Sequence, residues 1–242
     1  MLGCTSRRIA LTVMAICSLT LAACGDEAPP AAAPSVVPST SASVPTSTAG
    51  TAEESGAALL ATAKRTSSTV KSVRITMDLQ QGAEHNTMDI SGQADGSNQK
   101  GRMTSTSEGT LTNMVVAGKM YGMGDVRFWT SSGVPSAEAH RRVGKYLVKV
   151  ATPTKTARTY LAESLGEFDD AAGQSTTHPA TYQGEAAIKV TSTSDPGYWF
   201  AVTADPSHRP LEAHLPGADM TFSSWNAVTP FTAPPASQIY GG

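Results

Sequence analysis

The feature that most limits the fold of this chain is a set of segments in which apolar and polar residues alternate. In SVRITMDLQQ, residues 72–81, every second residue from Val73 to Leu79 is apolar, and those between are charged or polar. A period of two is typical of a strand with one buried and one solvated face. Further strands are predicted within residues 85–95, 99–107, 110–124, 145–150, 181–193, 197–205, 210–216 and 218–226. Most gaps are too short for crossover helices, so we expect antiparallel neighbours.

Helical patterns occur at three places. The letters TAEE at residues 51–54 fit a capping box, which predicts a helix from Thr51 to about Ser67. Residues 157–168 repeat apolar residues at helical spacing, and Ser136 is expected to cap a shorter helix. Strands on both sides of a small helical insertion predict one α+β domain, a strongly curved antiparallel sheet with helices packed on it.

The amino terminus has the composition of a secretory signal. Arg7 and Arg8 precede an apolar stretch, residues 9–23, of about fifteen residues, which is short of the roughly twenty needed to span a bilayer. The letters LAAC at residues 21–24 resemble the bacterial lipobox. That resemblance implies that the Cys24 thiol receives a diacylglycerol, that the chain is cleaved before Cys24, and that the new amino group is acylated. An ordinary signal peptide with an incidental cysteine is the alternative.

The export route stays open between two pathways. Residues 6–11, SRRIAL, partly resemble a twin-arginine signal, but Ala10 stands where that pattern prefers Phe. We therefore favour the general secretion route. Either route places the protein on the outer face of the cell membrane, held there through Cys24.

These observations divide the chain into three parts. Residues 1–23 are the predicted lipoprotein signal peptide, and residues 24–51, rich in Pro, Ala, Ser and Thr, are a predicted disordered tether. Residues 52–242 form the predicted single domain, with about its last ten residues loose. Cys4 and Cys17 leave with the signal peptide, so the domain is expected to hold together through its core and not through a disulfide.

Charge and motifs argue against several classes of function. The whole chain has 18 basic and 20 acidic residues, and losing Arg7 and Arg8 leaves 16 basic residues. This mildly acidic balance, without a basic patch, argues against a nucleic-acid partner. The sequence contains no G-x-S-x-G, H-E-x-x-H or C-x-x-C. We therefore predict no enzyme activity, no catalytic residue, no metal and no cofactor. The five histidines are scattered at His85, His140, His178, His208 and His214.

Two short motifs allow a weaker enzymatic hypothesis. Ser68 and Ser97 each stand three residues before a lysine, as in serine nucleophiles with a lysine base, but the S-D-N and K-T-G partner motifs are missing. A hydrolase using either serine is accordingly the third hypothesis for this chain. Gly122 and Gly124 are interpreted as a hairpin turn and not as a phosphate-binding loop.

Methionine is concentrated on the strands. Its side chain is flexible and polarizable, so it suits a surface that accommodates varied apolar shapes. Two interpretations are open: an ordinary filled core, or an apolar cavity beneath a sheet too wide for its helices to fill. The predicted cavity lining is Val73, Ile75, Met77, Leu79, Met88, Ile90, Met114, Met120, Phe200 and Met220.

Two stretches resemble a known family. In residues 197–215, GYWFAVTADPSHRPLEAHL, a strand, an Asp-Pro turn and an Arg-Pro restart precede a second apolar strand. Residues 117–133, AGKMYGMGDVRFWTSSG, are followed by GKYLVKV at residues 144–150. Both resemble the LolA/LolB-like half-barrel lipoprotein carriers, and most nearly the actinobacterial lipoproteins of the LppX/LprG type. The resemblance covers about residues 52–228.

The resemblance implies a half-open antiparallel barrel with helices on its concave face around an apolar cavity. It also implies a non-catalytic lipoprotein that binds lipid or lipoglycan acyl chains and carries them across the cell envelope. The alternative is an envelope sensor or interaction module on the same fold, with a filled core and a protein partner.

Overall fold

The computed structural model describes residues 54–150 and 155–241, which form one open antiparallel sheet with helices on it. The strands are β1 (Ser72–Gln81), β2 (Glu84–Gln93), β3 (Asn98–Ser105), β4 (Gly109–Val116), β5 (Lys119–Gly124), β6 (Leu147–Val150), β7 (Ser175–Tyr182), β8 (Glu185–Ser192), β9 (Trp199–Thr203), β10 (Pro210–Leu215) and β11 (Ala218–Ser223). Their order is β6-β5-β4-β3-β2-β1-β11-β10-β9-β8-β7, so within the described residues the sheet runs between two edge strands without closing. The expected open antiparallel architecture is confirmed.

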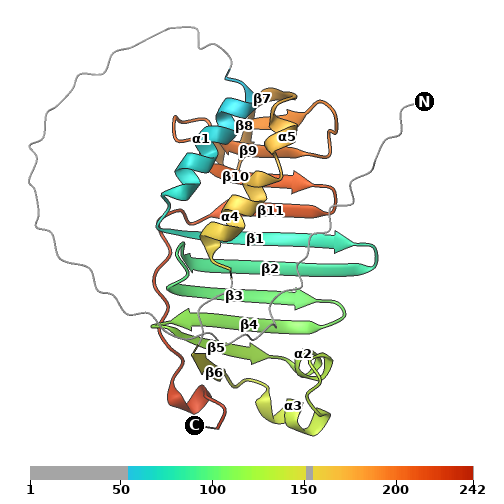
Figure 1. Cartoon of the computed structure of the whole chain (residues 1–242), viewed down its shortest axis with the longest axis vertical. Coiled ribbons are helices and arrows are strands. Elements are labelled where there is room, and N and C mark those ends of the chain that lie inside the picture. The colour runs from blue at the N-terminus through green and yellow to red at the C-terminus, as the bar shows by residue number, and fades with distance from the viewer. Residues whose placement is uncertain (1–53, 151–154, 242) are drawn as a thin grey trace, which may run out of the picture. The chain divides into compact units, whose positions relative to one another are not determined.

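The helices gather mainly over one half of the sheet. They are α1 (Gly56–Ser68), α2 (Val126–Ser131), α3 (Ser136–Arg142), α4 (Ala157–Gly166) and α5 (Asp169–Ala172), with a 3-10 turn at Ala236–Gln238. Figure 1 shows α1, α4 and α5 crossing in front of β7–β11 and β1, while α2 and α3 lie at the far end, by β5. We call the face that α1, α4 and α5 contact the inner face and the opposite one the outer face. No described helix is long and apolar enough to cross a membrane.

Helix α1 begins later than the sequence predicts. Its N-cap is Ser55, whose hydroxyl accepts a hydrogen bond from the Ala58 N–H at 3.3 Å. The Glu54 carboxylate contacts His208 Nε2 at 2.9 Å, so the capping box expected at residues 51–54 is wrong. Thr51 itself lies outside the described residues, as do the predicted signal peptide, Cys24 and the tether.

Helix α4 is fixed to the sheet at its start. The Thr156 hydroxyl accepts from the Thr159 N–H at 3.2 Å, and the buried Gln99 Oε1 on β3 accepts from the Ala157 N–H at 3.0 Å. These two acceptors satisfy N–H groups that the first turn of a helix leaves free. The apolar residues predicted for this helix face the core, since Leu161 is 0 % exposed and Leu165 1 %.

The inner face under α1, α4 and α5 holds a filled core. The largest fully buried side chains are Phe168, Phe200, Phe222, Leu59, Ile75, Leu161, Leu165 and Leu211. The rings of Phe168 and Phe200 meet edge to face with their centres 5.4 Å apart. This half of the sheet is therefore packed in the ordinary way of a protein interior.

After β11 the chain returns along the outer face as residues 224–241, which we call the C-terminal strap. Two strap residues, Phe231 and Ile239, pack with Val116 and Met123 on a small outer cluster of Met114, Tyr121 and Tyr146. The strap is also bonded to the sheet, because the Asn98 amide donates to Phe231 O at 2.8 Å and accepts from Phe231 N at 2.7 Å. The expectation that the last ten residues are loose is not met, since Ile239 bridges Tyr146.

Gly122 and Gly124 lie within β5, directly before α2, so their assignment to a hairpin turn is wrong. A Cβ on Gly124 would collide with the Phe128 ring. Glycine thus allows α2 to pack onto the strand. The N-terminus of α2 is occupied by Asp125, whose carboxylate accepts from the Phe128 N–H at 2.7 Å and the Thr110 N–H at 2.8 Å.

Candidate functional site

Four methionines stand side by side across the inner face. Met77 on β1 is paired with Met220 on β11 and with Met88 on β2, and Met88 is paired with Met103 on β3. Directly paired residues project from the same face of a sheet. We call Met220, Met77, Met88 and Met103 the methionine row. Leu111 of β4, the partner of Met103, continues it.

The methionine row leads out of the filled core. Met220 is 5 % exposed and Met77 8 %, whereas Met88 and Met103 are half-buried. Among the described helices, α4 contacts β1 and β2 and α2 contacts β4 and β5. Met103 is on β3, which lies between the strands contacted by α4 and those contacted by α2. The row is therefore covered at one end and partly open toward the other.

A second row beside it contains two glycines. It runs through Ile75, Ile90, Gly101, Asn113, Gly122 and Leu147 on β1 to β6. A Cβ on Gly101 would collide with Asn113 Oδ1, whereas one on Gly122 would meet nothing within 4 Å. The face thus has open space at Gly122. We call the half-buried residues Met88, Met103, Leu111, Asn113 and Gly122 the inner patch.

Helix α2 bounds the inner patch at one end. Gly124 is the cross-strand partner of Leu111, and the rings of Phe128 and Trp129 lie against it. The two rings also pack edge to face, with their centres 5.1 Å apart. The indole Nε1 of Trp129 is buried without a hydrogen-bond partner among the described residues. The Phe128 and Trp129 rings therefore border the inner face at the end of the methionine row.

The predicted lining residues fall into three groups. Seven are buried on the inner face: Val73, Ile75, Met77, Leu79, Ile90, Phe200 and Met220. Met88 and Met120 are half-buried on that face. Met114 lies on the outer face, where it is the partner of Tyr121 and packs under the strap, so it shares no surface with the others. Met103, which belongs to the row, was missed because its strand reads as polar in the sequence.

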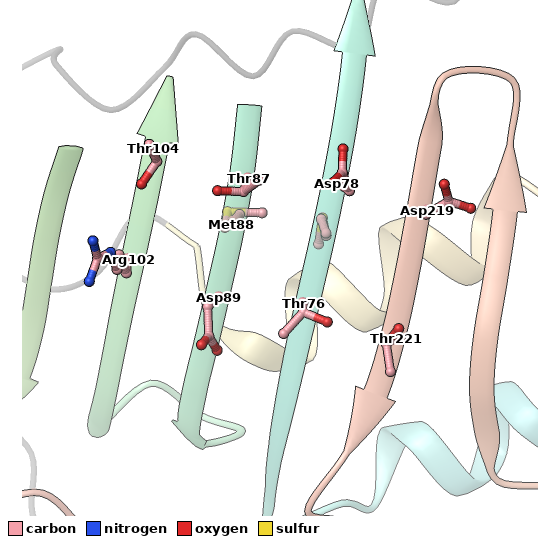
Figure 2. A pocket seen from close by; sticks show the side chains of 10 residues that line it. Thr76, Asp78, Thr87, Met88, Asp89, Arg102, Thr104, Asp219 and Thr221 are labelled. Atoms are coloured by element: carbon pink, nitrogen blue, oxygen red, sulfur yellow. The ribbon is translucent and has the colours of Figure 1, made fainter. Parts of the chain in front are cut away.

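The outer face carries a hollow of about 330 Å³. Figure 2 shows the residues of β1, β2, β3 and β11 that line it, which are Thr76, Asp78, Thr87, Met88, Asp89, Arg102, Thr104, Asp219 and Thr221, together with Met77. Asp78 pairs with His85 at 2.7 Å, Asp89 with Arg74 at 2.7 Å, and Asp219 with His214 at 2.6 Å. Exposed pairs of this kind contribute about 0–1 kcal/mol each. No group of three His, Cys, Asp or Glu side chains in the described residues has the geometry of a metal site.

The serines of the hydrolase hypothesis have partners other than lysine. The Ser68 hydroxyl donates to Arg65 O at 2.7 Å. The Ser97 hydroxyl donates to Asp95 Oδ1 at 2.8 Å, and hydrogen bonds from the Ser97 backbone and side chain lower the pKa of that carboxyl. These are turn and helix-end contacts, and neither forms a nucleophile–base pair.

No protein-family model matches this chain, and no curated protein matches it in sequence. Solved structures of similar chain path include LprF from Mycobacterium bovis, at 15 % identity, covering 74 % of this chain and 96 % of LprF with a TM-score of 0.45. The lipoprotein LppX from Mycobacterium tuberculosis is similar at 13 % identity, 72 % and 96 % coverage and a TM-score of 0.41. MucB in its complex with MucA from Pseudomonas aeruginosa is similar at 12 % identity, 77 % and 61 % coverage and a TM-score of 0.31. LppX is one of the LppX/LprG-type lipoproteins that the sequence resembles.

Proposed function

We propose that this protein is a membrane-anchored, non-catalytic lipoprotein that binds lipid or lipoglycan acyl chains and carries them across the cell envelope. The observation that carries this proposal is the methionine row, which leads from the filled core onto the half-buried inner patch. Thioether side chains adapt to apolar chains of different shape. Burying one methylene contributes about 0.8 kcal/mol, so such a surface can hold an acyl chain without catalytic groups.

The anchor is the second part of the proposal. Cys24 would carry a diacylglycerol on its thiol and an acyl chain on its amino group, at the outer face of the cell membrane. More than one chain is needed for stable attachment, because a single one binds a bilayer only marginally. The predicted tether, residues 24–51, would let the inner patch reach lipid while the protein stays attached.

A sensor or interaction module is the second candidate function, and the filled half of the inner face favours it. Phe168, Phe200 and Phe222 are each at most 2 % exposed, so no acyl chain enters beneath α1, α4 and α5 without displacing them. On this alternative the chain would report the state of the envelope to a protein partner. The two functions differ in whether the inner patch takes up lipid.

The open space at Gly122 provides the test. Full-length protein purified from a bacterial host is extracted with organic solvent and analysed by mass spectrometry, and binding of a fluorescent fatty acid is titrated. We expect co-purified lipid, and about tenfold or more weaker binding for Gly122→Phe, because the ring would fill the space that the ligand needs.

Gly166→Phe is the matched control, since a Cβ there also meets nothing within 4 Å and the residue ends α4, away from β5. It should bind the fatty acid as the unmodified protein does. Absence of lipid and of fatty-acid binding in the unmodified protein, together with a stoichiometric protein partner, would support the sensor instead.

A further inference from the structure

Asn113 is a polar residue in the middle of an apolar surface. It sits at the centre of β4, between its partners Gly101 and Gly122, on the same face as Ile90. Its neighbours on that face of β4 are Leu111 and Val115. Because both partners are glycines, no cross-strand side chain stands beside its amide.

The Asn113 amide has no hydrogen-bond partner among residues 54–150 and 155–241. Asn98, on the outer face, uses both ends of its amide on Phe231. Asn86 is also without a side-chain partner on the inner face, but it lies near the end of β2, between Leu79 on β1 and Ser105 on β3. Asn113 is thus set apart by its two glycine partners and its central place on the strand.

An asparagine is unusual at this position of a strand, because its neighbours on the same face are apolar. Asn is depleted in strands, and the half-buried Asn113 amide is not among the described fully buried atoms without a partner, so a ligand can reach it. Residues that break the local rules of a fold without a structural gain are expected at functional sites. Ligand sites are typically apolar with a few polar groups that fix the orientation of the ligand.

We propose that the Asn113 amide hydrogen-bonds the ester carbonyl at the head of a bound acyl chain. The hydrocarbon part would then lie along Met103 and Met88, in the row next to Asn113. The open space beside Gly122 receives the ester group. This inference rests on the proposed function and adds to it a preference for acyl esters over ethers and plain hydrocarbons.

The test compares two lipids that differ only in the linkage. Displacement of a pyrene-labelled alkane from the full-length protein is measured with dipalmitoylglycerol and with its dihexadecyl ether analogue. The unmodified protein should prefer the ester, and Asn113→Leu should reduce that preference by about two- to tenfold, the value of one hydrogen bond. Its urea midpoint should not fall, because no internal bond is lost. Asn113→Gln, which keeps an amide, should retain part of the preference.

Asn86→Leu is the control for loss of an inner-face asparagine, and it should keep the ester preference. If the unmodified protein binds both lipids equally, or if Asn113→Leu keeps the preference, the role of Asn113 is wrong while acyl binding stands. If the unmodified protein binds neither lipid nor the alkane, acyl binding and the role of Asn113 both fail.

Discussion

Glu138 on α3 joins three cationic or hydroxyl groups from two parts of the chain. Its Oε1 accepts from the Tyr240 hydroxyl at 2.6 Å and from Arg142 Nε at 2.9 Å, and its Oε2 accepts from Arg141 Nε at 2.8 Å. The hydrogen bond from Tyr240, followed by those from Arg142 and Arg141, lowers the pKa of Glu138 from 4.5 to about 2. Arg142 also lies over the Trp129 and Tyr240 rings. One carboxylate thus connects α3 to the end of the strap.

The depressed pKa of Glu138 sets the sign of a pH effect. Its stabilising contribution is fully present above pH 4.5 and is lost as pH falls from there through about 2. We expect Glu138→Gln to lower the free energy of unfolding at neutral pH, and this difference from the unmodified protein to shrink over that window. Urea unfolding between about pH 6 and pH 2 measures it. A difference that stays constant across the window would contradict the assignment.

Among the elements, the C-terminal strap has the least sequence signal and a clear structural role. It covers the outer cluster of Met114, Tyr121 and Tyr146, and backbone bonds join it to the sheet from Asn226 N to Ser72 O, at 2.7 Å, and from Tyr240 N to Tyr146 O, at 2.9 Å. The residues that the strap bonds to are distant in sequence, so no periodicity within residues 224–241 predicts these contacts.

The Asn98 amide is the point at which the strap is easiest to test. Asn98→Leu would leave the N–H and C=O of Phe231 without that partner, so we expect the free energy of unfolding to fall by about 1–3 kcal/mol. Asn86→Leu removes no such hydrogen bond, so it should lower the free energy of unfolding by less. Urea unfolding compares them, and dye binding should rise for Asn98→Leu as the outer cluster becomes exposed. Equal stability of the two variants would show that the strap contributes little.

For the whole molecule, the contrast between a filled half and a partly open half of one sheet is the main finding. The helices α1, α4 and α5 lie over β7–β11 and β1 (Figure 1), and α4 also contacts β2. The inner patch on β2–β5 is half-buried. The methionine row crosses from one half to the other. Side-chain chemistry is therefore constant along the row while exposure changes.

This gradient of exposure predicts the order of methionine oxidation. Under mild peroxide, Met88 and Met103 should form sulfoxide several times faster than Met77 and Met220, because accessible thioethers react first. A bound fatty acid should slow oxidation of the first pair and leave the second pair unchanged. Peptide mass spectrometry gives the four rates. Equal rates for all four residues would contradict the described packing.

The period-two pattern predicted every strand except β7, which lies mostly before the predicted strand at residues 181–193, and it also indicated which residues share a face within each strand. Thus Val73, Ile75, Met77 and Leu79 lie together on the inner face, as the sequence predicts. Helix α3 (Ser136–Arg142) forms where the sequence predicts a short helix, but its N-cap is Pro135 and no side chain caps it, so the capping role predicted for Ser136 is wrong. The lipobox around Cys24 is likewise a local signal and remains a prediction. Features that depend only on residues close together in the sequence can therefore be predicted from the sequence.

The faces of different strands could not be matched in this way, because turn length sets the register between them. The turn at Ala117–Gly118, with both residues at positive φ, has two residues, so Met114 pairs with Tyr121, and Met120 with Val115. Met114 and Met120 therefore face opposite ways. The sequence by itself determined all strands but β7 and the alternation within them, and it predicts the anchor at Cys24. Only the tertiary structure decided which methionines form one surface, because a single residue of register moves every side chain to the other face.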